Sequence, residues 1–301
     1  MRGPHYTDGA SRVSSIAAVA ILALPLLLSL GACSQIPEPE ENIESLTAVT
    51  ESPAQPGAAE EYDAELHPDP IVEPRDCDPL LVITVRGTGE PKKGQLLSPV
   101  ARAIEKADPD RVQTFTLDYP ADTDVNEGGT LGVRMLIDTL NVQAEHCPDQ
   151  RFALLGYSQG ALIVGDALSA PELRLVGETV GELSEDAAER VLAIVLYGNP
   201  RFAGGEAYDV GDFDEALGGI LPRTAGSFEA FADRMQDFCV AGDFICQSSL
   251  DLDEKGHVAY FDNGMQQQGA DFVIERMRQP GALPPPSITG PTTTPSPQPT
   301  P

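Results

Sequence analysis

The sequence predicts an α/β fold, in which a compact and mostly parallel sheet of about five strands lies between helices. Short apolar segments typical of buried strands alternate along the chain with segments of helical spacing. Such alternation indicates parallel strands whose connecting helices cover both faces of the sheet. The part of the chain expected to fold, 77–279, has the usual size of a single domain and is long enough to bury a core.

Each element rests on its own local pattern. The segment 80–85, Leu-Leu-Val-Ile-Thr-Val, is almost wholly apolar, as expected of a strand buried on both faces. Leu131, Met135, Ile137 and Leu140 have a spacing typical of a helix. The predicted elements in order are strand 80–85, strand 112–117, helix 130–144, strand 152–155, a helix over 161–168 and strand 191–197.

The N-terminal segment 1–32 has the features of an export signal. Arg2 and Arg12 precede an apolar stretch, 16–30, that is too short for a comfortable membrane span. The stretch ends in Leu-Gly-Ala-Cys, which resembles a bacterial lipobox and implies cleavage before Cys33 and lipidation of its thiol. The alternative is cleavage nearby by an ordinary signal peptidase. We therefore expect an exported protein, anchored to the cell envelope as a lipoprotein or else secreted.

Two further segments have compositions typical of disorder. The segment 33–76 is rich in Pro, Glu and Ala, and is predicted to be a disordered acidic spacer between membrane and domain. The Pro/Thr-rich tail 280–301 is predicted to be disordered as well. Of the five cysteines, lipidation of Cys33 leaves four, which can pair in an oxidising compartment.

Charge and composition exclude several classes of function. The formal net charge of −28 excludes nucleic-acid binding, which needs Lys and Arg for the phosphates. It also favours a neutral or apolar substrate over an acidic polymer. The sequence has no His-Glu-x-x-His motif and no clustered ligand spacing, so we expect neither metal nor cofactor. We expect the domain to be a monomer.

A candidate nucleophile lies between a predicted strand and a predicted helix. Gly156-Tyr157-Ser158-Gln159-Gly160 has the Gly-x-Ser-x-Gly pattern of the nucleophile elbow in α/β-hydrolases, in the strand-to-helix context that the elbow requires. The N-terminus of the following helix favours negative charge near Ser158. The competing interpretation is a glycine-rich turn with a passive serine.

A serine hydroxyl needs a base to act as a nucleophile. His5, His67 and His146 all precede Ser158, whereas His257 follows it, as the order serine, acid, histidine in α/β-hydrolases demands. His257 is therefore the candidate base. The alternative is an ordinary surface histidine in a loop.

The acid of the triad has several candidates between Ser158 and His257. Asp243 stands out because Cys239 and Cys246 bracket it, and a disulfide there would fix where its carboxylate points. Spacing alone leaves the choice open. The candidates are Asp233, Asp237, Asp243, Asp251, Asp253 and Glu254.

Three segments together resemble the cutinase family of serine esterases over 77–264. They are Arg86-Gly87-Thr88-Gly89-Glu90, the elbow 156–160, and Cys239-Val-Ala-Gly-Asp-Phe-Ile-Cys246 followed by His257-Val-Ala-Tyr260. Asn199-Pro200-Arg201 also resembles bacterial members of the family.

The resemblance implies a triad of Ser158, Asp243 and His257, and disulfides Cys77–Cys147 and Cys239–Cys246. It also suggests an oxyanion hole made by Thr88 and the backbone N–H of Gln159. Thr88 stands where the family often has serine, so its methyl group is expected to narrow the site. Arg86 and Glu90 either pair to hold their loop or are ordinary solvated charges.

These features favour a serine esterase that hydrolyses carboxylic esters, lipids or polyesters with short to medium acyl chains. An acetyl-polysaccharide esterase on the same fold is one alternative. A catalytically silent surface lipoprotein used for binding is another, and reactivity of Ser158 would distinguish it from the enzymes.

Overall fold

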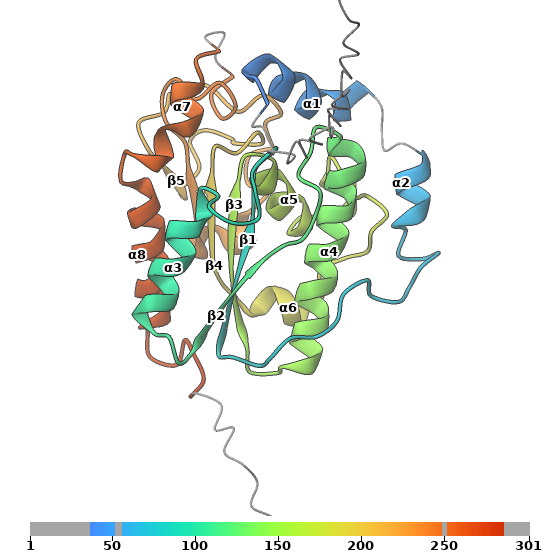
Figure 1. Ribbon diagram of the computed structural model, residues 1–301, viewed down its shortest axis with the longest axis vertical. Coiled ribbons are helices and arrows are strands. Elements are labelled where there is room, and N and C mark those ends of the chain that lie inside the picture. The colour runs from blue at the N-terminus through green and yellow to red at the C-terminus, as the bar shows by residue number, and fades with distance from the viewer. Residues whose placement is uncertain (1–36, 52–55, 249–251, 286–301) are drawn as a thin grey trace, which may run out of the picture. The chain divides into compact units, whose positions relative to one another are not determined.

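The computed structural model describes residues 37–51, 56–248 and 252–285 (Figure 1). The predictions for the export segment, for Cys33 and for the tail beyond residue 285 lie outside the described residues. Among the described helices, none combines the length and the apolar character that crossing a bilayer requires.

The centre of the fold is a six-stranded sheet in which every paired strand is parallel. Its spatial order is β2-β1-β3-β4-β6-β5. The apolar pattern predicts four of these strands; β6 and β5 escape it because they have just four and two residues, and each contains an aspartate. The strands are β1 (Leu80–Val85), β2 (Val112–Thr116), β3 (Arg151–Tyr157), β4 (Val191–Tyr197), β5 (Asp209–Val210) and β6 (Met235–Phe238).

Helices cover both faces of the sheet, as the alternating pattern predicts (Figure 1). Helices α4 and α5 pack on one face, and α3 and α8 pack on the other. The helices of this domain are α3 (Leu97–Ala107), α4 (Val125–His146), α5 (Gln159–Ala167), α6 (Glu185–Glu189), α7 (Glu254–Val258) and α8 (Met265–Met277), with short 3₁₀ helices η1 (Pro171–Leu173), η2 (Glu229–Arg234) and η3 (Ala259–Phe261).

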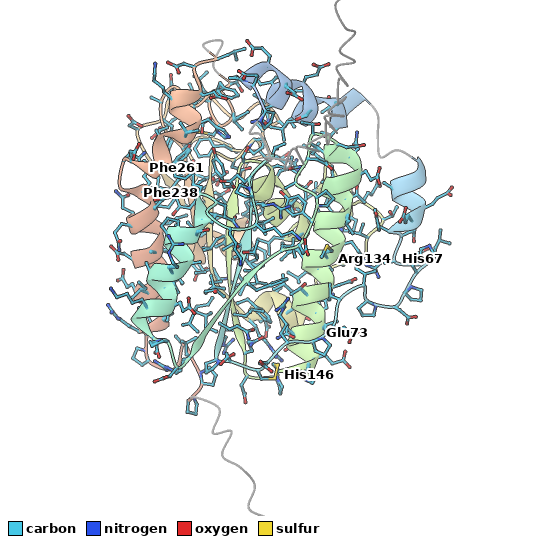
Figure 2. The ribbon with its side chains drawn as sticks, in the orientation of Figure 1. His67, Glu73, Arg134, His146, Phe238 and Phe261 are labelled. Atoms are coloured by element: carbon cyan, nitrogen blue, oxygen red, sulfur yellow. A yellow bond between two sulfur atoms is a disulfide. The ribbon has the colours of Figure 1, made fainter. Side chains whose placement is uncertain are left out.

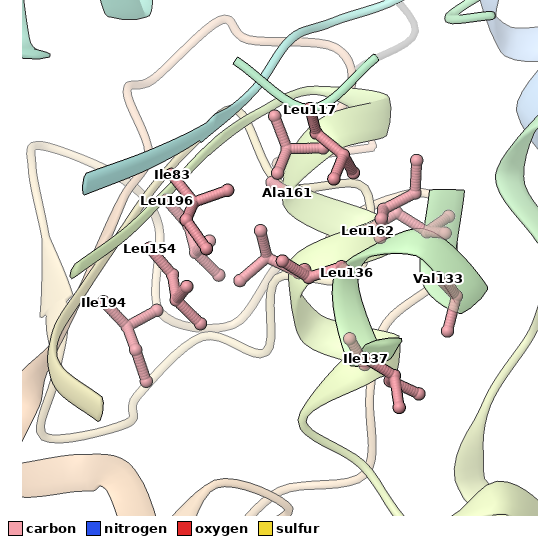
Figure 3. Close-up of a cluster of buried hydrophobic side chains, with 14 of the residues drawn as sticks. Ile83, Leu117, Val133, Leu136, Ile137, Leu154, Ala161, Leu162, Ile194 and Leu196 are labelled. Atoms are coloured by element: carbon pink, nitrogen blue, oxygen red, sulfur yellow. The ribbon is translucent and has the colours of Figure 1, made fainter. Parts of the chain in front are cut away.

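Side chains of successive strand residues enter opposite cores because their directions alternate along a strand. In β1, Leu81 and Ile83 face the core with α4 and α5, while Leu80 and Val82 face the core with α3 and α8. Figure 3 shows the first of these cores, where strand residues such as Ile83 face Leu136 of α4. A sheet buried on both faces holds the ends of its strands in fixed positions.

The segment predicted as a disordered spacer, 33–76, differs from that prediction where the structure describes it. It contains helices α1 (Pro39–Glu51) and α2 (Pro56–Glu61). Leu46 and Val49, three residues apart on one helix face, are buried in the same core as α4. Composition hides this because the sequence of α1 has as many glutamates as apolar residues.

An arginine of α4 binds the chain that leads from α2 to β1. The guanidinium of Arg134 donates to the carbonyls of His67 and Asp69 at 2.9 and 3.0 Å, and it pairs with Asp138. Figure 2 shows Arg134 on α4 and His67 on the neighbouring segment. Amino-acid composition gives no information on such hydrogen bonds to the backbone. This is a second reason why the spacer prediction differs from the structure.

Candidate active site

Ser158 lies at a sharp turn between β3 and α5. Its backbone has φ +52° and ψ −121°. Residues other than glycine rarely adopt this conformation, which costs about 1–3 kcal/mol. Gly160 makes this turn possible, because a Cβ there would lie 1.9 Å from the carbonyl oxygen of Val85. The geometry is that of a nucleophile elbow, which presents the serine at the carboxyl end of the sheet.

The imidazole of His257 lies between Ser158 and Asp243. Its Nε2 is 3.0 Å from the Oγ of Ser158, and its Nδ1 is 2.9 Å from Oδ1 of Asp243. All three side chains are buried, with 1% of Ser158, 0% of Asp243 and 5% of His257 exposed. With a proton on Nδ1 donated to the carboxylate, Nε2 has a lone pair available for the serine hydroxyl.

The three residues meet because parallel strands end at the same edge of a sheet. Ser158 follows β3, Asp243 follows β6, and His257 belongs to α7 beyond that edge (Figure 1). Ligand and catalytic sites of open α/β sheets are typically built at this edge.

Among the acid candidates that the structure describes, Asp243 is the one whose carboxylate contacts His257. Asp253 accepts from the backbone N–H of Lys255 at the start of α7, and Asp237 accepts from Asn199. Asp251 lies outside the described residues.

The carboxylate of Asp243 is held by several donors. Besides His257, the backbone N–H of Ile245 donates to Oδ1 at 2.8 Å and the hydroxyl of Tyr260 donates to Oδ2 at 2.6 Å. Burial alone would raise the pKa of Asp243, but the nearby His257 and these hydrogen bonds outweigh it and hold the pKa below its ordinary value. Asp243 is therefore an anion at neutral pH.

Both predicted disulfides are present. Cys239–Cys246 closes the loop that carries Asp243, and Cys77–Cys147 joins the start of the sheet to the end of α4. Sulfur and nitrogen ligands gather in one place among the described residues, at Cys77, His146 and Cys147 (Figure 2). Since the two sulfurs there are bonded to each other, that group has no thiolate to offer a metal.

Thr88 and Gln159, the predicted oxyanion-hole residues, also lie together. The hydroxyl of Thr88 donates to Oε1 of Gln159 at 3.2 Å, and both side chains are buried. The backbone N–H of Gln159 belongs to the first turn of α5, where N–H groups have no acceptor within the helix and the dipole favours negative charge.

Arg86 and Glu90 hold the Thr88 loop through hydrogen bonds to backbone groups. The Nε of Arg86 donates to the carbonyl of Glu90 at 2.9 Å. The carboxylate of Glu90 accepts from the N–H groups of Gly87 and Leu96, each at 2.8 Å. Burial raises the pKa of Glu90, against the effect of these hydrogen bonds. Both side chains are buried, which excludes the interpretation as solvated charges.

Sequence reasoning missed the aromatic residues around the imidazole. The ring of Tyr157 stacks on His257 with centroids 5.0 Å apart, and its hydroxyl donates to the backbone carbonyl of His257 at 3.0 Å. The position of Tyr157 next to Ser158 was the one signal that could have found it. These contacts help to fix the plane of the imidazole.

A cavity of about 670 Å³ opens beside the Thr88 loop. Its lining includes Thr88, Gly89 and Ala121, together with Glu38, just before α1, and Glu41 in the first turn of α1. The segment predicted to be a spacer thus contributes to the wall of the space next to the oxyanion hole.

The chain is similar to several known proteins. The family model described as Cutinase matches residues 76–277. A cutinase of Kineococcus radiotolerans is 32% identical to the chain over 208 residues, which are 68% of this chain and 64% of that protein, so the chain spans less than two thirds of that relative's length. The phospholipase Culp4 of Mycobacterium tuberculosis is 29% identical over 202 residues, covering 67% of this chain and 80% of that protein.

A solved structure shares the fold. An iodinated complex of acetyl xylan esterase superimposes with a TM-score of 0.59 at 25% identity, covering 67% of this chain and 100% of that chain.

Proposed function

The chain belongs to the cutinase family of serine hydrolases, and from this premise we propose that it hydrolyses carboxylic esters with Ser158 as nucleophile, His257 as general base and Asp243 as the orienting acid. The observation that carries the proposal is the unbroken contact from Oγ of Ser158 through the imidazole to the carboxylate, at 3.0 and 2.9 Å. A passive serine at a turn has no need of a buried imidazole and a buried anion in line with it.

The first half-reaction forms an acyl-enzyme. His257 Nε2 removes the proton of Ser158 as Oγ attacks the ester carbonyl, and Asp243 stabilises the resulting imidazolium. The hydroxyl of Thr88, released from Gln159, and the backbone N–H of Gln159 donate to the tetrahedral oxyanion; losing one such donor costs on the order of 3 kcal/mol. The imidazolium then protonates the departing alcohol.

The second half-reaction releases the acid. Water takes the place of the alcohol. His257 removes a proton from this water as the water oxygen attacks the carbonyl of acyl-Ser158. The collapse of the second tetrahedral intermediate returns the proton to Oγ. The enzyme is thereby regenerated without a net change in protonation.

We propose a neutral or apolar ester with a short to medium acyl chain as substrate. The net charge of −28 disfavours acidic polymers, and a lipid of the cell envelope suits a protein anchored there through Cys33. Export, anchoring at Cys33 or secretion, and the monomeric state are parts of this proposal. An acetyl-polysaccharide esterase is the second candidate, favoured by the structural likeness to acetyl xylan esterase.

A single panel of measurements tests the proposal. We expect a fluorophosphonate probe to label the purified protein at Ser158, and we expect Ser158→Ala to lose both labelling and hydrolysis of p-nitrophenyl esters while it unfolds at the same temperature as the wild type. Activity that peaks on acetylated xylan instead of p-nitrophenyl butyrate or octanoate would favour the polysaccharide esterase. No labelling of the folded wild type would indicate a silent binding protein and overturn the proposal.

A further inference from the structure

One polar contact of the catalytic group is not used by the three-residue mechanism. The carboxylate of Asp243 has two oxygens, and Oδ1 binds His257 and the loop backbone. Oδ2 accepts a hydrogen bond of 2.6 Å from the hydroxyl of Tyr260. Both side chains are wholly buried, so water does not compete for this contact.

The position of Tyr260 follows from that of His257. The two residues are three apart, in α7 and in the 3₁₀ helix η3 that continues it, so their side chains lie on the same side of this short segment. One segment thus places the base against Oδ1 and a phenol against Oδ2 of the same carboxylate.

The ring of Tyr260 is itself fixed in place. It packs edge-on against Tyr157 and Tyr197, with centroids 6.4 and 5.7 Å apart, and its oxygen lies 3.5 Å from the Sγ of Cys246. Burial and the charge of Asp243 raise the pKa of Tyr260 well above its ordinary value. The hydroxyl therefore stays protonated and is a donor to the carboxylate at all working pH values.

We propose that Tyr260 is a fourth, positioning member of the catalytic group, which fixes the rotation of the Asp243 carboxylate by binding Oδ2 so that Oδ1 faces Nδ1 of His257. This inference rests on the proposed esterase function. Without the phenol, the buried Oδ2 has no other donor among the hydrogen bonds that the structure shows at this atom, and only the contacts of Oδ1 remain to orient the carboxylate towards the imidazole.

The contact also adjusts how readily the Asp243–His257 pair takes up a proton. A hydrogen bond to the carboxylate favours its charged state, which opposes protonation of the pair. Other titratable groups interact with these residues: Glu90 of the Thr88 loop with His257, Tyr157 of β3 with Asp243, and Asp237 of β6 with Tyr260. These groups are unchanged when Tyr260 is replaced, so a shift in the acidic limb of the pH profile reports on the lost hydroxyl.

Tyr260→Phe is the direct test, with Tyr197→Phe as the matched control. The Tyr197 hydroxyl is also buried and donates to a backbone carbonyl, that of Met265 at 3.2 Å, so its loss measures the effect of removing a buried phenol hydroxyl away from Asp243. For Tyr260→Phe we expect kcat to fall about 10- to 100-fold with KM unchanged, and the acidic limb of kcat/KM to move to higher pH. For Tyr197→Phe we expect neither change.

A double-mutant cycle separates positioning from general loss of structure. Asp243→Asn should remove most of the effect of Tyr260→Phe on kcat, because the hydroxyl acts through the carboxylate. A loss of the same factor in both backgrounds, or equal losses for Tyr260→Phe and Tyr197→Phe, would overturn the proposal. So would a Tyr260→Phe enzyme with wild-type kcat and an unmoved acidic limb.

A second replacement tests the same contact if Tyr260→Phe does not fold. Site-specific 3-fluorotyrosine at position 260 keeps the shape of the ring and makes the phenol a stronger donor, so the acidic limb should move to lower pH; an unmoved limb contradicts the proposal. The outcomes are separable from those for the esterase function, because a wild-type protein that fails to react with fluorophosphonate contradicts that function before any variant is compared.

Discussion

Asp237 and Asp243 lie six residues apart on the same stretch of chain, and both are buried, yet their electrostatic states are opposite. Asp237 is in β6, where burial raises its pKa to about 8. The carboxylate of Asp209 on the neighbouring strand contributes to this rise. Asp243 is in the loop beyond β6, and its pKa is held below the ordinary value. At neutral pH the first is mostly a neutral acid, and the second is an anion.

The difference comes from the donors around each carboxylate. Asp237 accepts from one side-chain amide, Asn199 at 2.7 Å, and its Oδ1 has no hydrogen-bond partner among the described residues. Asp243 has the imidazole, a phenol and a backbone N–H. Burial penalises both charges, so the donors decide which carboxylate stays ionised and can stabilise an imidazolium.

The largest effect that tests this comparison is the loss of the Asp243 charge. We expect Asp243→Asn to lower kcat about 10⁴-fold, because the imidazolium loses its partner and the tautomer of His257 is no longer specified. Asp237→Asn keeps an acceptor for Asn199, and we expect it to change kcat by less than about 3-fold, or roughly 0.7 kcal/mol. Steady-state kinetics on a p-nitrophenyl ester checks both, and a large loss in Asp237→Asn would contradict the distinction.

The loop that carries Asp243 also has a covalent constraint that β6 lacks. Replacing Cys239 and Cys246 with alanine should lower kcat about 10-fold by loosening Asp243, at a cost of roughly 2.5 kcal/mol in the free energy of unfolding. Replacing Cys77 and Cys147 opens a longer loop and should cost about 4 kcal/mol.

The second pair serves as the control for the first. Because Cys77–Cys147 lies away from Asp243, its loss should leave kcat per folded molecule unchanged. Denaturant unfolding and active-site titration with a fluorophosphonate give the two quantities separately. Full kcat after loss of Cys239–Cys246 would show that the hydrogen bonds alone hold Asp243.

The smallest expected effect is on the pH dependence of the free energy of unfolding. Asp237 and Asp243 make this free energy change with pH in opposite directions. The pKa of Asp237 is raised in the folded state, so its contribution to stability is present below its ordinary pKa of 3.8 and is lost as the pH rises towards about 8. Asp243 has a lowered pKa, so its contribution is present above the ordinary value and is lost in acid.

The variant Asp237→Asn isolates the first of these terms. It should gain more than about 1 kcal/mol of stability relative to the wild type between pH 5 and pH 9. Urea unfolding at a series of pH values measures this gain. A constant difference between the two proteins across that range would mean that Asp237 is already ionised at pH 5.

The elements predicted well are those whose signal is local. An apolar run such as β1 or β4 and a glycine-flanked serine after a strand need no distant partner to be recognised. Among the elements missed, β5, β6 and α1 are short or polar, and they are held by pairing and burial against residues far away in the chain. Local composition therefore described α1 as part of a spacer.

By itself the sequence determined the alternation of strands and helices, the elbow at Ser158, the order of serine and histidine, and, through a family resemblance, the pairing of the cysteines. It left six acids open, because each has the same carboxylate chemistry in a linear string. Among the candidate acids that the structure describes, the tertiary structure identifies Asp243. Its carboxylate lies 2.9 Å from His257, and the surrounding donors keep that carboxylate charged. The ionisation of a buried group depends on neighbours that only the folded chain brings together.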